Sequence, residues 1–292
     1  MNMPSTLSSI VDQLKEGNLV PYLGPGALKG VVEKSTGKPI PAESRDLILG
    51  LSGGKEMAPR YMYEFPRAAM HVENSRGRSA ITRFLTETYQ TRQWSPSPLH
   101  EALGGLGVPY VIDTNRDISL LRAYSSTPHT LIVGYARLAG DGFRFTLHQW
   151  RDGQYAPVAA ASPVDPSLPV LFKPLGCPVP EPHFVASDAD FVDYITELMG
   201  GFAIPPFVKK LRVKKRYLVL GLGLVRDTER MVLSDMMYAG EGGFAFLEAA
   251  TDKEKRYCEK HGLEVLKHSV DELTQALSES AHSSESAHSG AA

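Results

Sequence analysis

Short apolar runs alternate with amphipathic segments along most of this chain. Apolar side chains at helical spacing, together with capping residues, predict helices in residues 7–14, 79–89, 98–106, 187–199, 227–237, 253–260 and 271–277. Continuous apolar runs predict buried strands in residues 19–23, 108–112, 169–173, 217–220, 243–247 and 263–266. Strands that alternate with helices in this way are typical of a parallel sheet covered on both faces. We therefore expect an α/β fold, a Rossmann-like doubly wound parallel sheet.

One region has a different period. Between residues 130 and 155 the apolar positions alternate, and Gly140-Asp-Gly142 and Asp152-Gly153 are hairpin signals. We expect residues 128–166 to form a β-rich insertion that projects from the sheet as antiparallel hairpins. An exposed hairpin edge can pair with another chain, so this insertion is predicted to bind a protein partner or a second copy.

The remaining organisation is simple. Residues 1–277 are expected to form one domain, because 292 residues with 42% hydrophobic content can fill a single large core. Residues 278–292 contain two copies of Ser-Glu-Ser-Ala-His-Ser and no large apolar side chain, so we expect a disordered tail. The histidines of this repeat make only a weak metal site, and no metal is predicted.

Charge and cysteine content exclude several classes of protein. A net charge of −2 argues against a dedicated nucleic-acid binder. No apolar run is long enough to cross a membrane, and the N-terminus lacks the pattern of a signal peptide. Two cysteines are too few for a disulfide framework or a four-cysteine zinc site. A cytoplasmic protein is the expectation.

Glycine and polar residues follow several of the predicted strands. The first strand runs into Gly24-Pro-Gly26, where a glycine turn can bring backbone N–H groups close to a phosphate. The turn also fits an ordinary strand-to-loop corner, since Gly30 comes one position too late for a dinucleotide fingerprint. Asp113-Thr-Asn-Arg-Asp117 follows the second strand, and Gly221-Leu-Gly223 follows a later one. Ligands of open α/β sheets bind at such strand ends, so these segments predict a common site.

In order and spacing, these motifs resemble the sirtuin-like domain family, in its zinc-free bacterial NAD-cleaving branch. Val20-Pro-Tyr-Leu-Gly-Pro-Gly26 is similar to the family's Gly-Ala-Gly motif, and Ile112-Asp-Thr-Asn-Arg-Asp117 to its Thr-Thr-Asn-Tyr-Asp motif. Val219-Leu-Gly-Leu-Gly223 with Asp227 is similar to the late glycine motif. The resemblance covers most of the chain, from about Leu14 to Leu273, as a divergent member.

The resemblance implies a pocket for NAD or ADP-ribose. Gly24 and Gly26 would lie near the phosphates, Thr114, Asn115 and Asp117 near the nicotinamide ribose, and Gly221 and Gly223 at the adenosine end. Asn115 would be the catalytic residue, because its amide can orient a hydroxyl or a water. The alternative for Asn115 is a turn residue that caps its own backbone.

The departures from the family pattern concern catalysis. Where active members carry Lys-x-His-Gly, this chain has Lys173-Pro-Leu-Gly176, so Leu175 stands at the position of the proton-accepting histidine. Leucine cannot transfer a proton, a function worth about 10²–10⁴-fold in rate. Serines of the two glycine motifs are also replaced, by Ala27 or Leu28 and by Gly223 or Leu224.

Two functions remain open after these losses. The lost side chains favour a pseudo-enzyme that binds NAD, ADP-ribose or a protein partner in a regulatory or scaffold role. The alternative is an NAD glycohydrolase, which converts NAD to nicotinamide and ADP-ribose, with a relocated general base. His148 and His183 are the candidates for that base, although each is more typical of a surface or core histidine.

Overall fold

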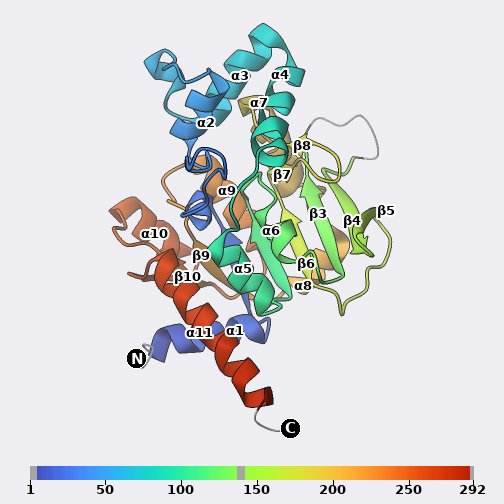
Figure 1. The fold of residues 1–292 in the computed structure, drawn as a ribbon. Helices are drawn as coiled ribbons and strands as arrows, with labels where there is room; N and C mark the ends of the chain where they lie inside the picture. The colour runs from blue at the N-terminus through green and yellow to red at the C-terminus, as the bar shows by residue number, and fades with distance from the viewer. Residues whose placement is uncertain (1–4, 137–141, 290–292) are drawn as a thin grey trace.

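The fold is built on one large sheet. The structure is a computed structural model that describes residues 5–136 and 142–289 (Figure 1). Within these residues the sheet has nine strands, and their order across the sheet is β11 (Leu263–Leu266), β10 (Gly243–Phe246), β9 (Arg216–Leu220), β1 (Leu19–Leu23), β2 (Tyr110–Asp113), β6 (Val170–Lys173), β3 (His129–Gly134), β4 (Phe145–Arg151) and β5 (Gln154–Val158). A separate two-stranded pair joins β7 (Gly176–Cys177) to β8 (His183–Phe184).

The strands from β11 to β3 run parallel, and their carboxyl ends lie together at one edge. Leu23 at the end of β1 pairs with Leu220 of β9 on one side and with Asp113 of β2 on the other. Ile112 pairs with Phe172, so β6 ends at the same level. The motif-bearing strand ends thus line one edge of a single parallel sheet, as the sequence predicts. The chain moves outward from β1 in both directions, through β2 on one side and β9 on the other, which makes this the switch point of the sheet.

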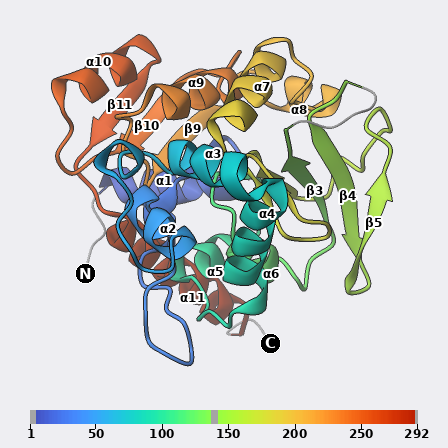
Figure 2. The same ribbon diagram turned by 90° about the horizontal axis from the view of Figure 1, so that it is seen from above.

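Helices cover both faces of the sheet (Figure 2). One core contains Leu19 and Leu23 of β1, while the other contains Val20 and Tyr22, because successive side chains of a strand point to opposite faces. Within the part of the chain that the structure describes, no helix is both long and apolar enough to cross a bilayer. The helices are α1 (Ser5–Lys15), α2 (Ser44–Leu51), α3 (Phe65–Arg76), α4 (Arg78–Thr86), α5 (Pro98–Gly105), α6 (Ser119–Ala123), α7 (Asp188–Met199), α8 (Pro206–Leu211), α9 (Asp227–Met236), α10 (Asp252–Lys260) and α11 (Val270–Ser289).

These helices divide into three groups. The side with Leu19 and Leu23 is covered by α1, α5, α6 and α11, and the opposite side by α7, α8, α9 and α10. Helices α2, α3 and α4 share a third core and form a cap over the carboxyl ends of the strands (Figure 1). The α/β doubly wound class is therefore confirmed, and the cap closes the edge where the predicted site residues lie.

The β-rich insertion differs from its prediction in one respect. Strand β3 does not project from the sheet, because it pairs parallel with β6 through Thr130–Val170 and Ile132–Phe172. The β4–β5 hairpin then continues the same sheet with antiparallel pairing. Every residue of β3 is buried, so both faces of this strand are covered, which favours a place inside the sheet over a projecting hairpin. The turn expected at Gly140-Asp-Gly142 lies partly outside the described residues.

The C-terminal repeat also differs from its prediction. Helix α11 continues through Ser289, so the segment expected to be disordered from residue 278 is helical as far as that residue. Leu273, Ala276 and Leu277 are buried against the sheet's helical layer and anchor the first turns. Alanine and glutamate in the repeat are good helix formers and extend a helix that is already nucleated.

Candidate functional site

Two glycine turns meet at the switch point of the sheet. A Cβ on Gly24 would lie 2.7 Å from the carbonyl oxygen of Gly221, and a Cβ on Gly221, whose φ is +63°, would lie 2.5 Å from the nitrogen of Ala27. Only glycine permits this approach of backbone to backbone. The N–H of Gly24 donates to the oxygen of Leu220 at 2.9 Å, and that of Gly26 donates to the oxygen of Gly221 at 2.8 Å. These two N–H groups are therefore committed within the protein and not available to a phosphate.

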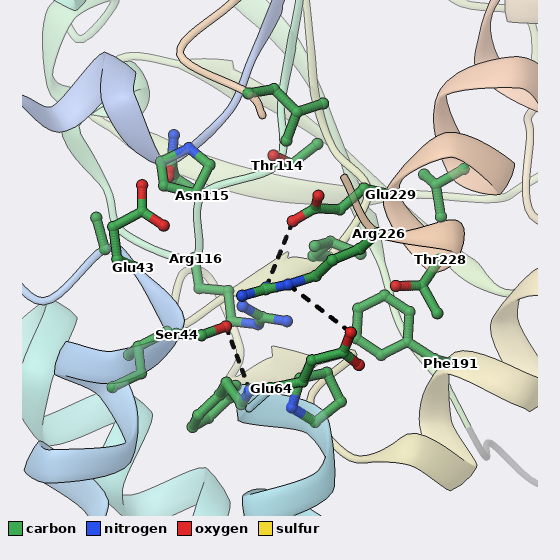
Figure 3. Close-up of a pocket in the computed structure, with 18 of the residues that line it drawn as sticks. Glu43, Ser44, Glu64, Thr114, Asn115, Arg116, Phe191, Arg226, Thr228 and Glu229 are labelled. Atoms are coloured by element: carbon green, nitrogen blue, oxygen red, sulfur yellow. Dashed lines mark hydrogen bonds and ion pairs between the residues drawn. The ribbon is translucent and has the colours of Figure 1, made fainter. Parts of the chain in front are cut away.

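A cavity of about 770 Å³, including its part open to solvent, lies between the strand ends and the helical cap. We call it the central cavity, and Figure 3 shows it in close-up. Its lining includes Thr114, Asn115 and Leu175 from the strand ends, Glu43 and Glu64 from the cap, and Glu229 from α9. Thr114 and Asn115, two of the three residues predicted for the ribose, thus line a hollow of the protein.

Asn115 is held rigidly at the wall of this cavity. Its side chain is 6% exposed. Its Nδ2 donates to the carbonyl oxygen of Gly24 at 2.9 Å and to Oδ1 of Asp113 at 2.8 Å. Its backbone N–H also donates to Asp113, at 3.0 Å, so the cap of this turn is Asp113 and not Asn115 itself. These contacts leave the amide oxygen of Asn115 as the group that can meet a ligand.

Leu175 lines the same cavity, at the position where the family pattern has a histidine. The two histidines considered as replacements lie elsewhere. His148, on β4, contacts the hydroxyl of Thr146 through Nε2 at 3.0 Å, and His183 packs against the ring of Tyr135 in the β7–β8 region. Neither lines the central cavity. Neither histidine can therefore serve as a relocated base at this site.

The ionisable residues of the cavity were not identified from the sequence. Arg226, the residue before α9, lies between two carboxylates, with Nη1 3.5 Å from Oε1 of Glu229 and Nε 3.8 Å from Oε1 of Glu64 (Figure 3). Burial raises the pKa of Glu229 to about 7, opposed by Arg226 and reinforced by Glu43 and Glu64. Burial likewise raises the pKa of Glu43. A carboxyl group whose pKa is raised by burial in a cavity is typical of functional sites.

No sequence signal marks these carboxylates, because they come from three distant segments that only the cap brings together. Arg116, the central residue of the strand-end motif, was also missed. Its Nε and Nη2 donate to the carbonyl oxygen of Val185 at 3.0 and 2.5 Å, and its guanidinium lies 5.5 Å from the centre of the Phe65 ring. Arg116 therefore fastens the cap to the strand ends and is not paired with a cavity carboxylate.

A second hollow lies on the other side of the glycine turns. This glycine groove encloses about 660 Å³, including open solvent, and its lining includes Gly26, Gly221 and Gly223. Leu222 lines both the groove and the central cavity, so the two hollows are neighbours. The residues predicted for the two ends of a dinucleotide therefore divide between adjacent hollows, although Gly24 lines neither.

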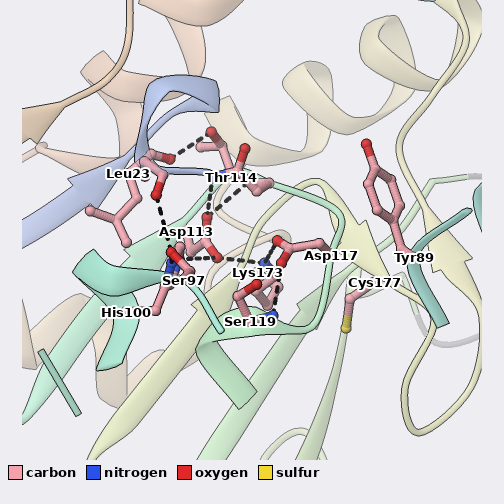
Figure 4. Close-up of polar contacts among 12 residues, drawn as sticks. Leu23, Tyr89, Ser97, His100, Asp113, Thr114, Asp117, Ser119, Lys173 and Cys177 are labelled. Atoms are coloured by element: carbon pink, nitrogen blue, oxygen red, sulfur yellow. Dashed lines mark hydrogen bonds and ion pairs between the residues drawn. The ribbon is translucent and has the colours of Figure 1, made fainter. Parts of the chain in front are cut away.

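Beneath the cavity floor, a buried polar network joins three elements (Figure 4). Lys173, which is fully buried, lies with Nζ 2.6 Å from Oδ2 of Asp113 and 3.7 Å from Oδ1 of Asp117. His100, on α5, contacts the same Asp113 oxygen at 3.3 Å through Nε2, and its Nδ1 contacts the Ser97 hydroxyl at 2.7 Å. Asp117, predicted to bind the ribose, belongs to this network and lines neither hollow.

The charges of this network support one another. Burial alone would raise the pKa of Asp113, but Lys173 and His100 lower it below its ordinary value. Conversely, burial would lower the pKa of Lys173, but Asp113 and Asp117 raise it. Both groups are thus held ionised, and Asp113 in turn orients Asn115. The network therefore holds the cavity wall in place rather than exchanging protons with a ligand.

Within the described residues, no group of three or more histidine, cysteine, aspartate or glutamate side chains has a metal-binding arrangement. Cys177 and Cys258 are both buried and unpaired. Burial raises the pKa of the Cys177 thiol to about 11, which makes it a poor nucleophile.

No protein-family model and no curated protein matches the chain. Among solved structures, it is similar to a Sir2 variant with a deacetylated p53 peptide and 3′-O-acetyl ADP ribose, at 15% identity and a TM-score of 0.42 over 94% of this chain and 98% of that one. It is also similar to a structure on the basis of sirtuin substrate affinity, at 16% identity and a TM-score of 0.41 over 96% and 99% of the two chains. Both are sirtuins, the family that the sequence motifs resemble. The likeness is distant, so each residue's role rests on its own contacts.

Proposed function

We propose that this chain is a sirtuin-like protein that binds NAD or ADP-ribose across the central cavity and the glycine groove. The observation that carries the proposal is the pair of adjacent hollows at the switch point of the sheet, separated by the glycine turns and sharing Leu222. An elongated nucleotide with two distinct ends suits such a divided site, at the position where open α/β sheets bind ligands. Asn115 offers its amide oxygen to a ribose hydroxyl.

We further propose that the protein binds this nucleotide in a regulatory or scaffold role and does not turn it over by the family's histidine-dependent route. The support is Leu175, which lines the cavity where a proton acceptor is needed. A cytoplasmic location stays a prediction.

Binding can be tested by filling the glycine groove. A Cβ on Gly223 would meet only a methyl of Val225 at 4.0 Å, and its φ lies outside the region reserved for glycine, so Gly223→Trp adds bulk to the groove without breaking the fold. We expect titration calorimetry to show NAD and ADP-ribose binding to the wild type, and binding weaker by about tenfold or more in the variant, through lost space for the ligand.

The matched control for that experiment is Gly105→Trp. Gly105, at the end of α5, is exposed and would meet nothing within 4 Å, so the same substitution there leaves both hollows unchanged. Equal loss of binding in both variants, or no binding by the wild type, would contradict the proposed nucleotide site.

A second candidate function is an NAD glycohydrolase with a relocated general base. The observation that favours it is Glu229, whose carboxyl titrates near neutral pH in the cavity that also contains Asn115. Such a carboxylate could accept a proton from an attacking water. Nicotinamide release that depends on both Asn115 and Glu229 would support the glycohydrolase function.

The edge of the sheet supports the proposal of a protein partner or self-association through residues 128–166. Strand β5 is the outermost strand beside β4 and is largely exposed, although Pro157 removes one of its N–H donors. A charge on this edge opposes strand pairing, so we expect Ala156→Lys to weaken association by about tenfold. Sedimentation of the wild type, this variant and Ser278→Lys as an exposed control would measure the effect. Identical assembly and identical co-purifying proteins in all three would count against the edge.

A further inference from the structure

A dense run of basic residues lies at the end of the sheet opposite the cap. Residues 209–216 include the end of α8 and the start of β9, and the amino end of β9 lies away from the central cavity (Figure 1). Six of these eight residues carry a positive charge, namely Lys209, Lys210, Arg212, Lys214, Lys215 and Arg216. Charges of one sign gathered on a small surface attract groups of the opposite sign.

Three of these cations are held in place by neutral groups. Nη1 of Arg212 donates to the carbonyl oxygen of Asp235 at 2.7 Å, and Nη1 of Arg216 donates to an amide side chain on α1 at 3.0 Å. Nζ of Lys215 donates to the carbonyl oxygen of Gly17 at 2.5 Å. Carbonyl and amide oxygens fix the position of a cation and leave its net charge in place.

The other three cations, Lys209, Lys210 and Lys214, are exposed. Within residues 5–136 and 142–289, no basic side chain of this run forms an ion pair. The run therefore presents flexible ammonium groups beside guanidinium groups that are already fixed.

The segments that contact the run do not balance its charge. Residues 13–18 and 235–242 supply its hydrogen-bond partners. Together they add one ammonium and three carboxyl groups, which belong to Lys15, Glu16, Asp235 and Glu241. Burial raises the pKa of Asp235, against the pull of Arg212. Seven cations thus meet at most three carboxylates, in a chain whose total net charge is −2.

Apolar side chains are exposed among these cations. Val213, inside the run, is 49% exposed. Tyr238 is 68% exposed, and the guanidinium of Arg212 lies 5.2 Å from the centre of its ring. The N–H of Lys214 donates to the carbonyl oxygen of Ala239 at 2.9 Å, which holds this tyrosine segment beside the run. Exposed apolar groups inside a charged rim are typical of a surface that binds protein.

We propose that residues 209–216 and Tyr238, which we call the basic end, bind an acidic segment of a partner protein that carries apolar side chains among its carboxylates. The carboxylates complement the exposed ammonium groups, and the apolar side chains cover Val213 and Tyr238. The basic end lies outside residues 128–166 and lines neither the central cavity nor the glycine groove. It is therefore a docking site in addition to those already proposed.

The charge of the whole chain favours an acidic peptide over a nucleic acid. A nucleic acid extends past the basic end and meets the field of a molecule with net charge −2. A short acidic segment meets only the local field, because salt screens charges that lie beyond about 8–10 Å. Val213 offers no ring on which a base could stack, but it can pack against an aliphatic side chain.

The test measures binding of a labelled peptide by fluorescence anisotropy. The peptide is rich in glutamate, with leucine and tyrosine among the carboxylates. We expect the wild type to bind it, with an affinity that falls as salt rises from about 50 to 200 mM. The triple variant Lys209→Gln, Lys210→Gln, Lys214→Gln should bind about tenfold more weakly and with a flatter salt dependence, because the mobile ammonium groups are gone.

The matched control is the triple variant Lys34→Gln, Lys38→Gln, Lys55→Gln. These lysines are exposed in the loops before and after α2, and the control loses the same net charge far from the basic end. It should bind the peptide like the wild type. Val213→Ser should weaken binding severalfold and keep the salt dependence, because it removes apolar contact and no charge.

Equal weakening in both triple variants, or no peptide binding by the wild type, would overturn the proposal. Tighter binding of oligo(dT), or of phosphatidylserine vesicles in a sedimentation assay, would also overturn it in favour of a nucleic acid or a membrane. Weakening confined to the variant of the basic end would support it. NAD and ADP-ribose binding is measured in the same proteins and should be equal in all of them, so a failure of the nucleotide site is seen separately.

Discussion

Lys173→Met is expected to destabilise the protein by about 3–5 kcal/mol, the range for removing one partner of a buried ion pair. Lys173 and Asp113 are both fully buried with 2.6 Å between Nζ and Oδ2, and Asp117 lies on the other side of the same ammonium. Methionine has a similar length but no charge, so two carboxylates would remain without their cation. Urea unfolding of wild type and variant measures the difference.

The pH dependence of this effect has a definite sign. In the wild type the pKa of Asp113 is lowered, so its stabilisation is present above its unfolded-state value of about 3.9 and lost as the pH falls below that value. Without Lys173, burial raises the pKa of Asp113. At pH values above that raised pKa, Asp113 is ionised and buried without its cation, which destabilises the protein. The deficit of Lys173→Met should therefore be larger at pH 8 than at pH 4.5.

Two further variants make the test specific. Asp113→Asn in the Lys173→Met background should restore part of the stability, because it removes one uncompensated charge. Lys255→Met, at a side chain 60% exposed on α10, is the matched control and should change stability little. A Lys173→Met protein as stable as this control would show that the network does not hold the cavity wall.

Nicotinamide release by the purified wild type is expected to be negligible, because Leu175 provides no proton acceptor and general acid–base catalysis is worth about 10²–10⁴-fold. Pro174 fixes the backbone beside it, which limits movement of a neighbouring group into the gap. Leu175→His places an imidazole in the cavity that also contains Asn115 and is expected to raise release above the wild-type level. Release from excess NAD, followed over time, measures both.

Controls separate proton transfer from a simple change of polarity. Leu175→Gln adds a polar group of similar size without a base and should stay at the wild-type level. Asn115→Ala should remove whatever activity Leu175→His gains. Robust wild-type turnover that Asn115→Ala abolishes would instead refute the pseudo-enzyme proposal, and its loss in Glu229→Gln would identify the relocated base.

The sequence alone was sufficient to predict the sheet and the edge at which the candidate site residues lie. Buried apolar runs such as residues 217–220 favour a strand covered on both faces, because both sets of alternating side chains are apolar. Gly24 and Gly221 were recognisable because the close approach of two backbones admits no side chain. Asn115 and Leu175 could be placed at the site because each lies two residues beyond the end of a parallel strand.

The composition of the cavity was decided only by the tertiary structure. Glu43, Glu64 and Glu229 are ordinary surface-type residues in the sequence, and nothing local distinguishes them from other glutamates. They become a cluster because the helical cap folds over the strand ends, where burial raises the pKa of Glu43 and of Glu229. The position of Asp117 beneath the cavity was also decided by the tertiary structure. It follows from the contact with Lys173, which lies 56 residues further along the sequence. Local patterns depend on neighbours in the chain, whereas the energy of a charge depends on every group that surrounds it in space.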